Sequence, residues 1–280
     1  MFFLVTLMAC NTKQDTGSRN TILVSILPQK TFVEKIAGTD FNVIVLIPPG
    51  SNPSAYSLSP SLMADVARSV VWFRIGHIGF EYSWGDNIAR INREMKVIDL
   101  SAGLDLIKKF KADSAVNTAG YDPHTWLSPA AVKKMSLKIM ETLTMLNPDK
   151  KTTYKNNFNR FILETDSIDV EIKKILYDCN GKTIIVFHPS LSYFARDYGL
   201  KQVSLEPGGK EPTPESLLRV IETAKTENIG VIYIQGEVDK DQATIFAEET
   251  GGKIIRINPL DPSWSNNLLF IAKTIRKNME

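Results

Sequence analysis

The sequence predicts an α/β fold with two lobes, each with a mainly parallel sheet, joined by a single long helix. Short apolar, β-branched runs alternate with amphipathic segments along most of the chain, a pattern typical of parallel sheets covered by helices. A long segment of helical periodicity lies near the middle of the chain, and the same alternation resumes after it. A length of 280 residues is sufficient for two lobes of ordinary size.

The N-terminal lobe is expected over residues 21–147. Its predicted strands are residues 21–27, 41–47, 69–75 and 97–100. Its predicted helices are residues 29–37, a segment that begins at Ser59-Pro60, residues 81–91 and residues 129–146. Ser128 followed by Pro129 is typical of a helix N-cap with proline at the first helical position.

A long linking helix is expected over residues 148–178, with an N-cap at Asn147, and a C-terminal lobe over residues 179–280. Some 28 residues of helix span about 40 Å, which is enough to connect two lobes. The predicted strands of the second lobe are residues 183–187, 202–205, 230–234 and 253–257. Its predicted helices are residues 191–198, 213–227, 240–249 and a last helix from Trp264.

Composition and charge describe a globular chain, because 43% of the residues are hydrophobic and 23% are charged. The net charge of +2 indicates neither a nucleic-acid nor a membrane-surface partner. Residues 1–20 are different: an apolar run, MFFLVTLMAC, is followed by a polar stretch. It resembles a bacterial lipoprotein signal and tether in which Cys10 receives the lipid, although the usual basic start is missing. Cys179, without a nearby activating base in the sequence, is expected to be a small filler.

Polar side chains follow several of the predicted strands, where parallel sheets bind their ligands. His77 and His188 each follow a strand, and His124 lies in the rigid turn before Ser128-Pro129. These are all of the histidines in the chain. Three imidazoles from different loops, completed by an oxygen ligand, are typical of a zinc site. A hydrogen-bonded histidine in a tight turn is the alternative for each residue taken alone.

Several motifs, taken in order, resemble those of the metal-binding (cluster A-I) substrate-binding proteins of zinc and manganese ABC importers. The motifs are LIPPGSNPSAYSLSPSLM, IGHIGFE, YDPHTWLSP, FHPSLSYFARDYGL, EPGGKEPTPESL and INPLDPSW. The resemblance extends from about Thr21 to the C-terminus. It implies two α/β lobes joined by a rigid helix, with the metal bound between the lobes.

The family's ligand positions carry over only in part. His124 and His188 match two of its ligands, whereas Ser54 and Asn258 stand where the family has a histidine and, usually, an aspartate. A hydroxyl is a poor zinc ligand, so the site has to be completed differently. The family's zinc members often carry a histidine-rich loop, and residues 108–120 here contain no histidine.

The predicted site therefore consists of His77, His124 and His188, completed by Asp261, Asn258 or water. His77 would take the place left by Ser54, from the same lobe. Residues expected to lie behind the ligands and orient an imidazole are Gln235, Glu237 and Ser54. The alternative for His77 is a structural hydrogen bond across its turn, and for Gln235 and Glu237 it is ordinary loop structure.

The predicted function is capture of a divalent metal, zinc first and manganese next, and its delivery to an ABC permease. The resemblance implies a monomer that is not an enzyme and is lipid-anchored on the periplasmic or cell-surface side of a bacterial membrane. One alternative is a binding or adhesion protein of the same fold whose metal site has decayed, suggested by Ser54 and Asn258. The other is a zinc hydrolase with Glu237 as general base, although HExxH and GxSxG motifs are absent from the sequence.

Overall fold

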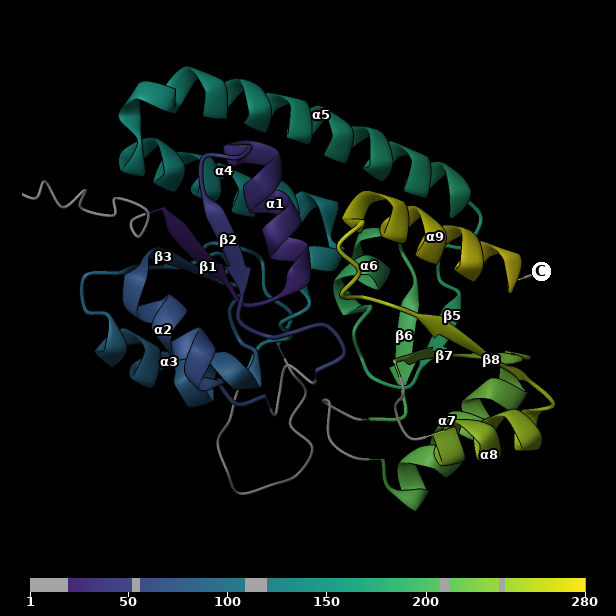
Figure 1. The fold of residues 1–280 in the computed structure, drawn as a ribbon. Coiled ribbons are helices and arrows are strands. Elements are labelled where there is room, and N and C mark those ends of the chain that lie inside the picture. Colours follow the sequence, from purple (N-terminus) through teal and green to yellow (C-terminus); the bar gives the residue numbers. More distant parts are fainter. Residues whose placement is uncertain (1–19, 52–55, 109–119, 207–211, 237–239, 280) are drawn as a thin grey trace, which may run out of the picture.

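The computed structural model describes residues 20–51, 56–108, 120–206, 212–236 and 240–279. In this part of the chain, two four-stranded sheets form the centres of two lobes. The lobes lie side by side beneath one long helix, α5 (Lys151–Ile175), which runs over both of them (Figure 1). The predicted fold class, two α/β lobes with parallel sheets and a connecting helix, is confirmed.

The N-terminal sheet has the strand order β2-β1-β3-β4, and all its pairs are parallel. Its strands are β1 (Thr21–Val24), β2 (Asn42–Val45), β3 (Ser69–Arg74) and β4 (Lys96–Asp99). Helices α1 (Leu27–Ala37), α2 (Pro60–Arg68) and α3 (Gly79–Ile91) connect them. All three residues 22–24 of β1 are fully buried, as expected for a central strand covered on both faces.

Strand β1 ends three residues earlier than predicted, and α1 begins two residues earlier. The side chain of Gln29 explains both differences, because its Oε1 accepts hydrogen bonds from the backbone nitrogens of Ser25 (2.9 Å) and Ile26 (3.0 Å). These two backbone N–H groups therefore do not bond within the sheet, and the chain turns directly into helix α1. Pro28 then occupies the first turn of α1, where proline is tolerated because its missing N–H has no helical partner.

The connection between the lobes starts with η2 (Thr125–Leu127) and α4 (Pro129–Leu146), followed by η3 (Pro148–Lys150) and α5. Ser128 caps α4 as predicted, with its Oγ accepting from the nitrogen of Ala131 at 3.1 Å. The predicted side-chain cap at Asn147 is wrong. Asn147 makes no capping hydrogen bond, and its side chain bonds with Tyr154 instead.

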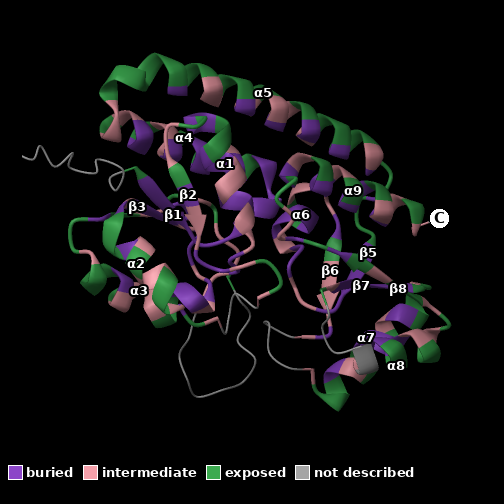
Figure 2. Ribbon diagram, in the orientation of Figure 1, coloured by how far each residue is buried: buried purple, intermediate pink, exposed green. Residues whose placement is uncertain are grey.

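Helix α5 is a rod about 38 Å long at 1.5 Å per residue. It packs against α1 and α4 in the N-terminal lobe and against α9 (Trp264–Lys277) in the C-terminal lobe. Its inward side chains are buried, including Tyr154, Phe161 and Ile172. The opposite face is exposed along its length (Figure 2). One helix is therefore packed against both lobes.

The C-terminal sheet has the order β6-β5-β7-β8, again with parallel pairs only. Its strands are β5 (Thr183–Val186), β6 (Lys201–Ser204), β7 (Val231–Gln235) and β8 (Lys253–Ile257). Its helices are α6 (Ser192–Asp197), α7 (Pro214–Thr226), α8 (Lys240–Thr250) and α9. The N-cap of α7 is Thr213, which forms a capping box with Ser216.

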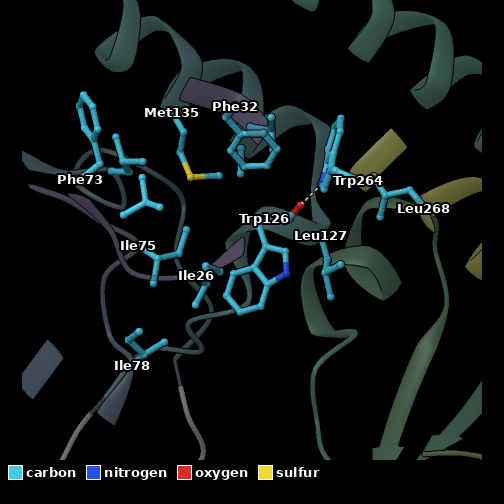
Figure 3. Close-up of a cluster of buried hydrophobic side chains, with 14 of the residues drawn as sticks. Ile26, Phe32, Phe73, Ile75, Ile78, Trp126, Leu127, Met135, Trp264 and Leu268 are labelled. Carbon is cyan, nitrogen blue, oxygen red and sulfur yellow. Dashed lines mark hydrogen bonds between the residues drawn. The ribbon is translucent and has the colours of Figure 1, made fainter. Parts of the chain in front are cut away.

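The main hydrophobic cluster is continuous from one lobe to the other. Figure 3 shows Trp126 and Trp264 at its centre, with Phe32 and Met135 from the N-terminal lobe. Trp264 donates from Nε1 to the carbonyl oxygen of Trp126 at 2.6 Å, and Trp126 donates from Nε1 to the carbonyl of Pro259 at 2.8 Å. Both indole nitrogens are thus satisfied across the boundary between the lobes.

A second, smaller cluster lies on the other face of the C-terminal sheet, under α7 and α8. Strand β5 separates the two clusters by simple alternation. Ile184 and Val186 belong to the main cluster, whereas Ile185 and Phe187 belong to the smaller one.

Cys179 is buried beside the last turn after α5. Burial raises the pKa of its thiol, and the neighbouring Asp178 acts in the same direction. A thiol held in its protonated form is unreactive, which agrees with the predicted filler role. Within the ranges that the structure describes, no helix combines the length and apolar character needed to cross a bilayer.

Candidate metal site

His124 is held in a tight turn between the isolated bridge of Tyr121 and the start of α4. The carboxylate of Asp122 accepts two hydrogen bonds from this residue, one from the backbone nitrogen at 2.9 Å and one from Nδ1 at 2.8 Å. The His124 side chain is only 12% exposed. The sequence predicted this rigid placement from the prolines, but the direct restraint on the ring is the carboxylate two residues earlier.

The ionisation of Asp122 follows from its surroundings. Burial by itself would raise the pKa of this carboxyl group. The charge and hydrogen bonds of His124, together with a bond from Ser192, outweigh burial and hold the pKa below its usual value. Asp122 is therefore a carboxylate at neutral pH and acts as a hydrogen-bond acceptor for the imidazole.

His188 follows β5 in the C-terminal lobe and is held in a similar way. Its Nδ1 lies 2.5 Å from Oε2 of Glu206, which follows the neighbouring strand β6. Gln235, at the end of β7, fixes the same turn by donating to the carbonyl oxygen of His188 at 3.4 Å and to the hydroxyl of Ser190. Gln235 thus contacts the backbone carbonyl of His188, and its predicted role in orienting an imidazole stays a prediction.

The rings of His124 and His188 meet across the boundary between the lobes. Their centroids are 5.3 Å apart, and the planes are nearly perpendicular, at 73°. In each ring Nδ1 faces a carboxylate oxygen, so the favoured tautomer carries its proton on Nδ1 and a lone pair on Nε2. An imidazole oriented in this way by a carboxylate is the usual arrangement of metal-binding histidines.

His77 lies after β3, in the loop that leads into α3. Its Nδ1 is 2.7 Å from the hydroxyl oxygen of Tyr82, and its ring centroid is 5.1 Å from that of Tyr121. The Nδ1 of this imidazole therefore faces the hydroxyl of a phenol. The backbone of His77 has a φ of 64°, which is uncommon for a residue other than glycine.

The structure brings two of the three histidines together directly. Among the residues that it describes, no group of three or more His, Cys, Asp or Glu side chains lies close enough to hold a metal ion. Tyr121, the ring neighbour of His77, is three residues before His124 in the chain. The assignment of His77 as a third ligand stays a prediction.

Asn258 and Asp261 lie in the turn after β8, beside a cavity of about 680 Å³ between β8 and the start of α9. Oδ1 of Asn258 accepts from the nitrogen of Leu260 at 3.2 Å, and Oδ1 of Asp261 accepts from the nitrogen of Ser263 at 2.8 Å. Gly50 of the N-terminal lobe also lines this cavity. Both side chains thus have one oxygen engaged in shaping their own turn.

Three residues singled out from the sequence lie outside the described residues, namely Cys10, Ser54 and Glu237. The histidine-free stretch 109–119 lies outside them as well. The predicted lipidation, the replacement at position 54 and the supporting role of Glu237 stay predictions.

Sequence reasoning missed the two carboxylates that orient the histidine pair. Asp122 stands in the motif of His124, and its spacing of two residues from the histidine was a usable signal. Glu206 is 18 residues from His188 in the chain. The signal for Glu206 was topological, because a residue after β6 lies beside one after β5 when these strands are adjacent.

Comparison with known proteins identifies the family of this chain. The chain matches the family described as ZnuA, "Zinc-uptake complex component A periplasmic", over residues 22–279. It belongs to the ZnuA family. Membership confirms the resemblance that was inferred from the ordered motifs.

Individual members of the ZnuA family show the range of named ligands. The zinc-binding lipoprotein AdcA of Streptococcus pneumoniae is 28% identical over 267 residues, with 91% of this chain and 53% of AdcA covered. The manganese-binding lipoprotein MntA of Halalkalibacterium halodurans is 23% identical over 247 residues, covering 85% of this chain and 80% of MntA. A solved structure titled "Crystal structure of ZnuA" superposes with a TM-score of 0.86 at 33% identity, covering 93% of this chain and 99% of that one. The family consists of metal-binding components of transport systems.

Proposed function

We propose that this protein captures a divalent transition metal outside the cytoplasmic membrane and delivers it to the permease of an ABC importer. Zinc is the first candidate for the cargo and manganese the second. The observation that carries the proposal is the pair formed by His124 and His188. Their rings lie 5.3 Å apart, one from each lobe, and each Nδ1 is held by a carboxylate.

The chemistry of this pair favours zinc. Two imidazoles with Nδ1 facing carboxylates can each present Nε2, the kind of nitrogen ligand that Zn²⁺ prefers, whereas a shell of carboxylates would favour Mn²⁺. A zinc ion at about 2.0–2.1 Å from each Nε2 would bridge the lobes. Metal binding requires the neutral form of each ring, with its proton on Nδ1 facing Asp122 or Glu206 and its lone pair on Nε2.

His77 is the third ligand in this proposal. It belongs to the N-terminal lobe, and its Nδ1 is engaged by the hydroxyl of Tyr82. When that oxygen accepts from Nδ1–H, Nε2 is the nitrogen that would bind the metal. Asp261, Asn258 or water completes the site from the C-terminal lobe. The turn that holds both residues is tied to the histidine pair through the bond from Trp126 to the carbonyl of Pro259.

The same proposal places the protein at the membrane surface by a lipid on Cys10. The apolar run that ends at Cys10 supports this location, and the relatives AdcA and MntA are named lipoproteins. The protein would act as a monomer. Its partner, the permease, would receive the ion without any covalent chemistry by the protein.

The test is a zinc titration by calorimetry on protein purified without chelator, after elemental analysis of the bound metal. One equivalent of zinc is expected, and His124→Ala and His188→Ala are each expected to lower the affinity at least about a hundredfold. His77→Ala tests the third ligand by the same measurement. Asn266→Ala, at the cavity beside Asn258, serves as a control that should leave the affinity unchanged. An empty protein, with no zinc affinity in the wild type, would contradict the proposal and support a decayed site.

A further inference from the structure

A buried carboxylate lies directly beneath the loop that carries His77. Glu81, in the first turn of α3, has a side chain that is 0% exposed. Its Oε1 accepts from the hydroxyl of Ser25 at 2.5 Å and from the backbone nitrogen of Ile75 at 2.7 Å. Its Oε2 accepts from the backbone nitrogen of Gly76 at 2.8 Å. The two residues before His77 are therefore both bonded to one side chain.

This carboxylate is itself fixed by contacts with β1 and β3. Trp72 donates from Nε1 to Oγ of Ser25 at 3.1 Å, so the hydroxyl that meets Glu81 cannot rotate freely. Gln29 joins the same strands, because it accepts from the nitrogen of Ser25 and donates to the carbonyl of Phe73 at 3.0 Å. The network anchors Glu81 in the core of the lobe, with its two oxygens aimed at the end of β3.

The loop above Glu81 has an unusual backbone conformation. Gly76 has a φ of 87°, and a Cβ at this position would lie 2.3 Å from Oγ of Ser101. His77 follows with a φ of 64°, and Asn228 is the only other residue besides glycine with a positive φ among the described residues. Residues other than glycine seldom adopt this conformation, although asparagine and histidine do so more often than most. Such a conformation persists only where the surroundings impose it.

We propose that Glu81 is a positioning residue for His77: by accepting hydrogen bonds from the nitrogens of Ile75 and Gly76, it holds the imidazole in the left-handed conformation that presents it beside Tyr82 and Tyr121. The assignment concerns the backbone and the ring orientation of His77. Its consequence for metal binding rests on the proposed function, in which His77 is a ligand.

The substitution Glu81→Gln tests this assignment with almost no change in size. An amide has one accepting oxygen, and its NH₂ group only donates. Whichever way it is oriented, one of the two backbone N–H groups at positions 75 and 76 loses its acceptor. The left-handed turn then loses one of its two restraints, and His77 is free to relax. Ser25→Ala is the matched control, because it removes one hydrogen bond from Glu81 and leaves both backbone bonds in place.

The first measurement is a long-range ¹H–¹⁵N correlation spectrum of the imidazole groups. The chain contains three histidines, and the signals of His77 are assigned by their loss in His77→Ala. Glu81→Gln is expected to shift the ring signals of His77 and to change its tautomer populations, with those of His124 and His188 unmoved. Ser25→Ala should leave all three rings as in the wild type. Unchanged His77 signals in Glu81→Gln, or equal shifts in all three rings, would overturn the proposal.

The second measurement is a double-mutant cycle for zinc affinity. Glu81→Gln alone is expected to lower the affinity about tenfold, as residues that orient ligands do. In the His77→Ala background the same change should have no further effect, since the group that it positions is gone. If Glu81→Gln lowers zinc affinity equally in the wild type and in His77→Ala, Glu81 acts on the whole lobe, and the assignment is rejected.

The two measurements separate the positioning role from the metal-binding role. If His77→Ala leaves zinc affinity unchanged, His77 is not a ligand, and the imidazole spectrum alone decides whether Glu81 positions it. If Glu81→Gln fails to fold, Glu81→Asp is the second variant. It keeps the charge but is one methylene too short to reach both backbone nitrogens, so the same shift of the His77 signals is expected.

Discussion

The two lobes have the same strand order but distribute their buried side chains differently. In the N-terminal lobe, the consecutive residues 22–24 of β1 all belong to the main hydrophobic cluster. In the C-terminal lobe, alternate residues of β5 belong to different clusters, with Ile185 and Phe187 facing α7 and α8. The inner face of the second lobe is therefore part of the core of the first. The side chains on the outer face of the second lobe form the separate, smaller cluster under α7 and α8.

Truncating one large side chain in each cluster should show whether the two hydrophobic clusters are stabilised independently. Trp264→Ala in the main cluster and Phe246→Ala in the smaller one are each expected to cost about 3–5 kcal/mol of unfolding free energy. Trp264 contacts Phe32 and Phe161, so its loss should speed hydrogen exchange in both lobes. Phe246→Ala should speed exchange only in β7, α7 and α8. If Trp264→Ala speeds hydrogen exchange in the C-terminal lobe alone, the two lobes are stabilised independently.

The histidine pair and His77 also differ in the side chains that hold them. His124 and His188, which meet across the boundary, have carboxylate partners, whereas His77 has the phenol of Tyr82. A carboxylate stabilises the positive charge that an imidazole gains when it binds a metal, and a neutral phenol does so much less. The pair that bridges the lobes is thus predicted to bind the ion more strongly than the third imidazole.

Removal of the carboxylates should reveal this difference. Glu206→Gln and Asp122→Asn are each expected to lower zinc affinity about 10- to 100-fold, because the neutral amide no longer fixes the tautomer or offsets the charge. Zinc titration by calorimetry measures the change, and thermal unfolding of the metal-free variants controls for loss of structure. Affinities within twofold of wild type would refute a supporting role for these carboxylates.

The phenol is expected to matter less. Tyr82→Phe removes one hydrogen bond between neutral groups, worth about 1 kcal/mol or roughly a fivefold change in zinc affinity. The ring that packs beside His77 is retained. A loss of zinc affinity as large as that in Glu206→Gln would show that the phenol supports metal binding as strongly as a carboxylate does.

The smallest expected effect concerns the buried Glu81. It is a change with pH in the free energy of unfolding. Burial raises the pKa of this carboxyl group above its ordinary value of 4.5, and the bonds from Ser25 and the charge of Arg74 lower it only in part. A group that binds its proton more tightly when folded contributes most below its ordinary pKa, and this contribution is lost as the pH rises through the folded value. The unfolding free energy of wild type relative to Glu81→Gln should therefore fall with rising pH.

Urea unfolding of both proteins at a series of pH values measures this difference. Unfolding of Ser25→Ala over the same range is the control, because it retains the titrating group. A difference between wild type and Glu81→Gln that stays constant or grows with pH would show that the pKa of Glu81 is not raised in the folded protein.

The fold was largely predictable from the sequence, because alternating strand and helix periodicity determines a parallel α/β arrangement. The errors arose where a single side chain competes with the regular pattern. Gln29 takes the backbone nitrogens of Ser25 and Ile26 out of β1. Asn147 bonds with Tyr154 instead of capping a helix. Such local competition is decided by tertiary contacts, which periodicity does not contain.

Two of the predicted ligand residues, His124 and His188, lie together in the structure, whereas His77 as a ligand stays a prediction. Each histidine follows a strand or precedes a proline-marked turn, and local sequence is enough to find such positions. Glu206 reaches His188 only because β5 and β6 are neighbours in the sheet. His77 has a left-handed backbone directly after two residues whose nitrogens bond to Glu81, and no local pattern around a histidine indicates this conformation.

A single rod that joins both lobes also acts as a lever. Since α5 is about 38 Å long, a tilt of roughly 5° about one end displaces the other end by about 3 Å. Half-way along the rod the same tilt gives about 1.5 Å. Zinc–imidazole bonds of about 2.0–2.1 Å tolerate only a few tenths of an ångström, so a movement of that size between the lobes would break one of the two proposed bonds to His124 and His188. A permease that leaned on one lobe would thus release the ion with a very small movement, and the long helix would set the mechanical advantage.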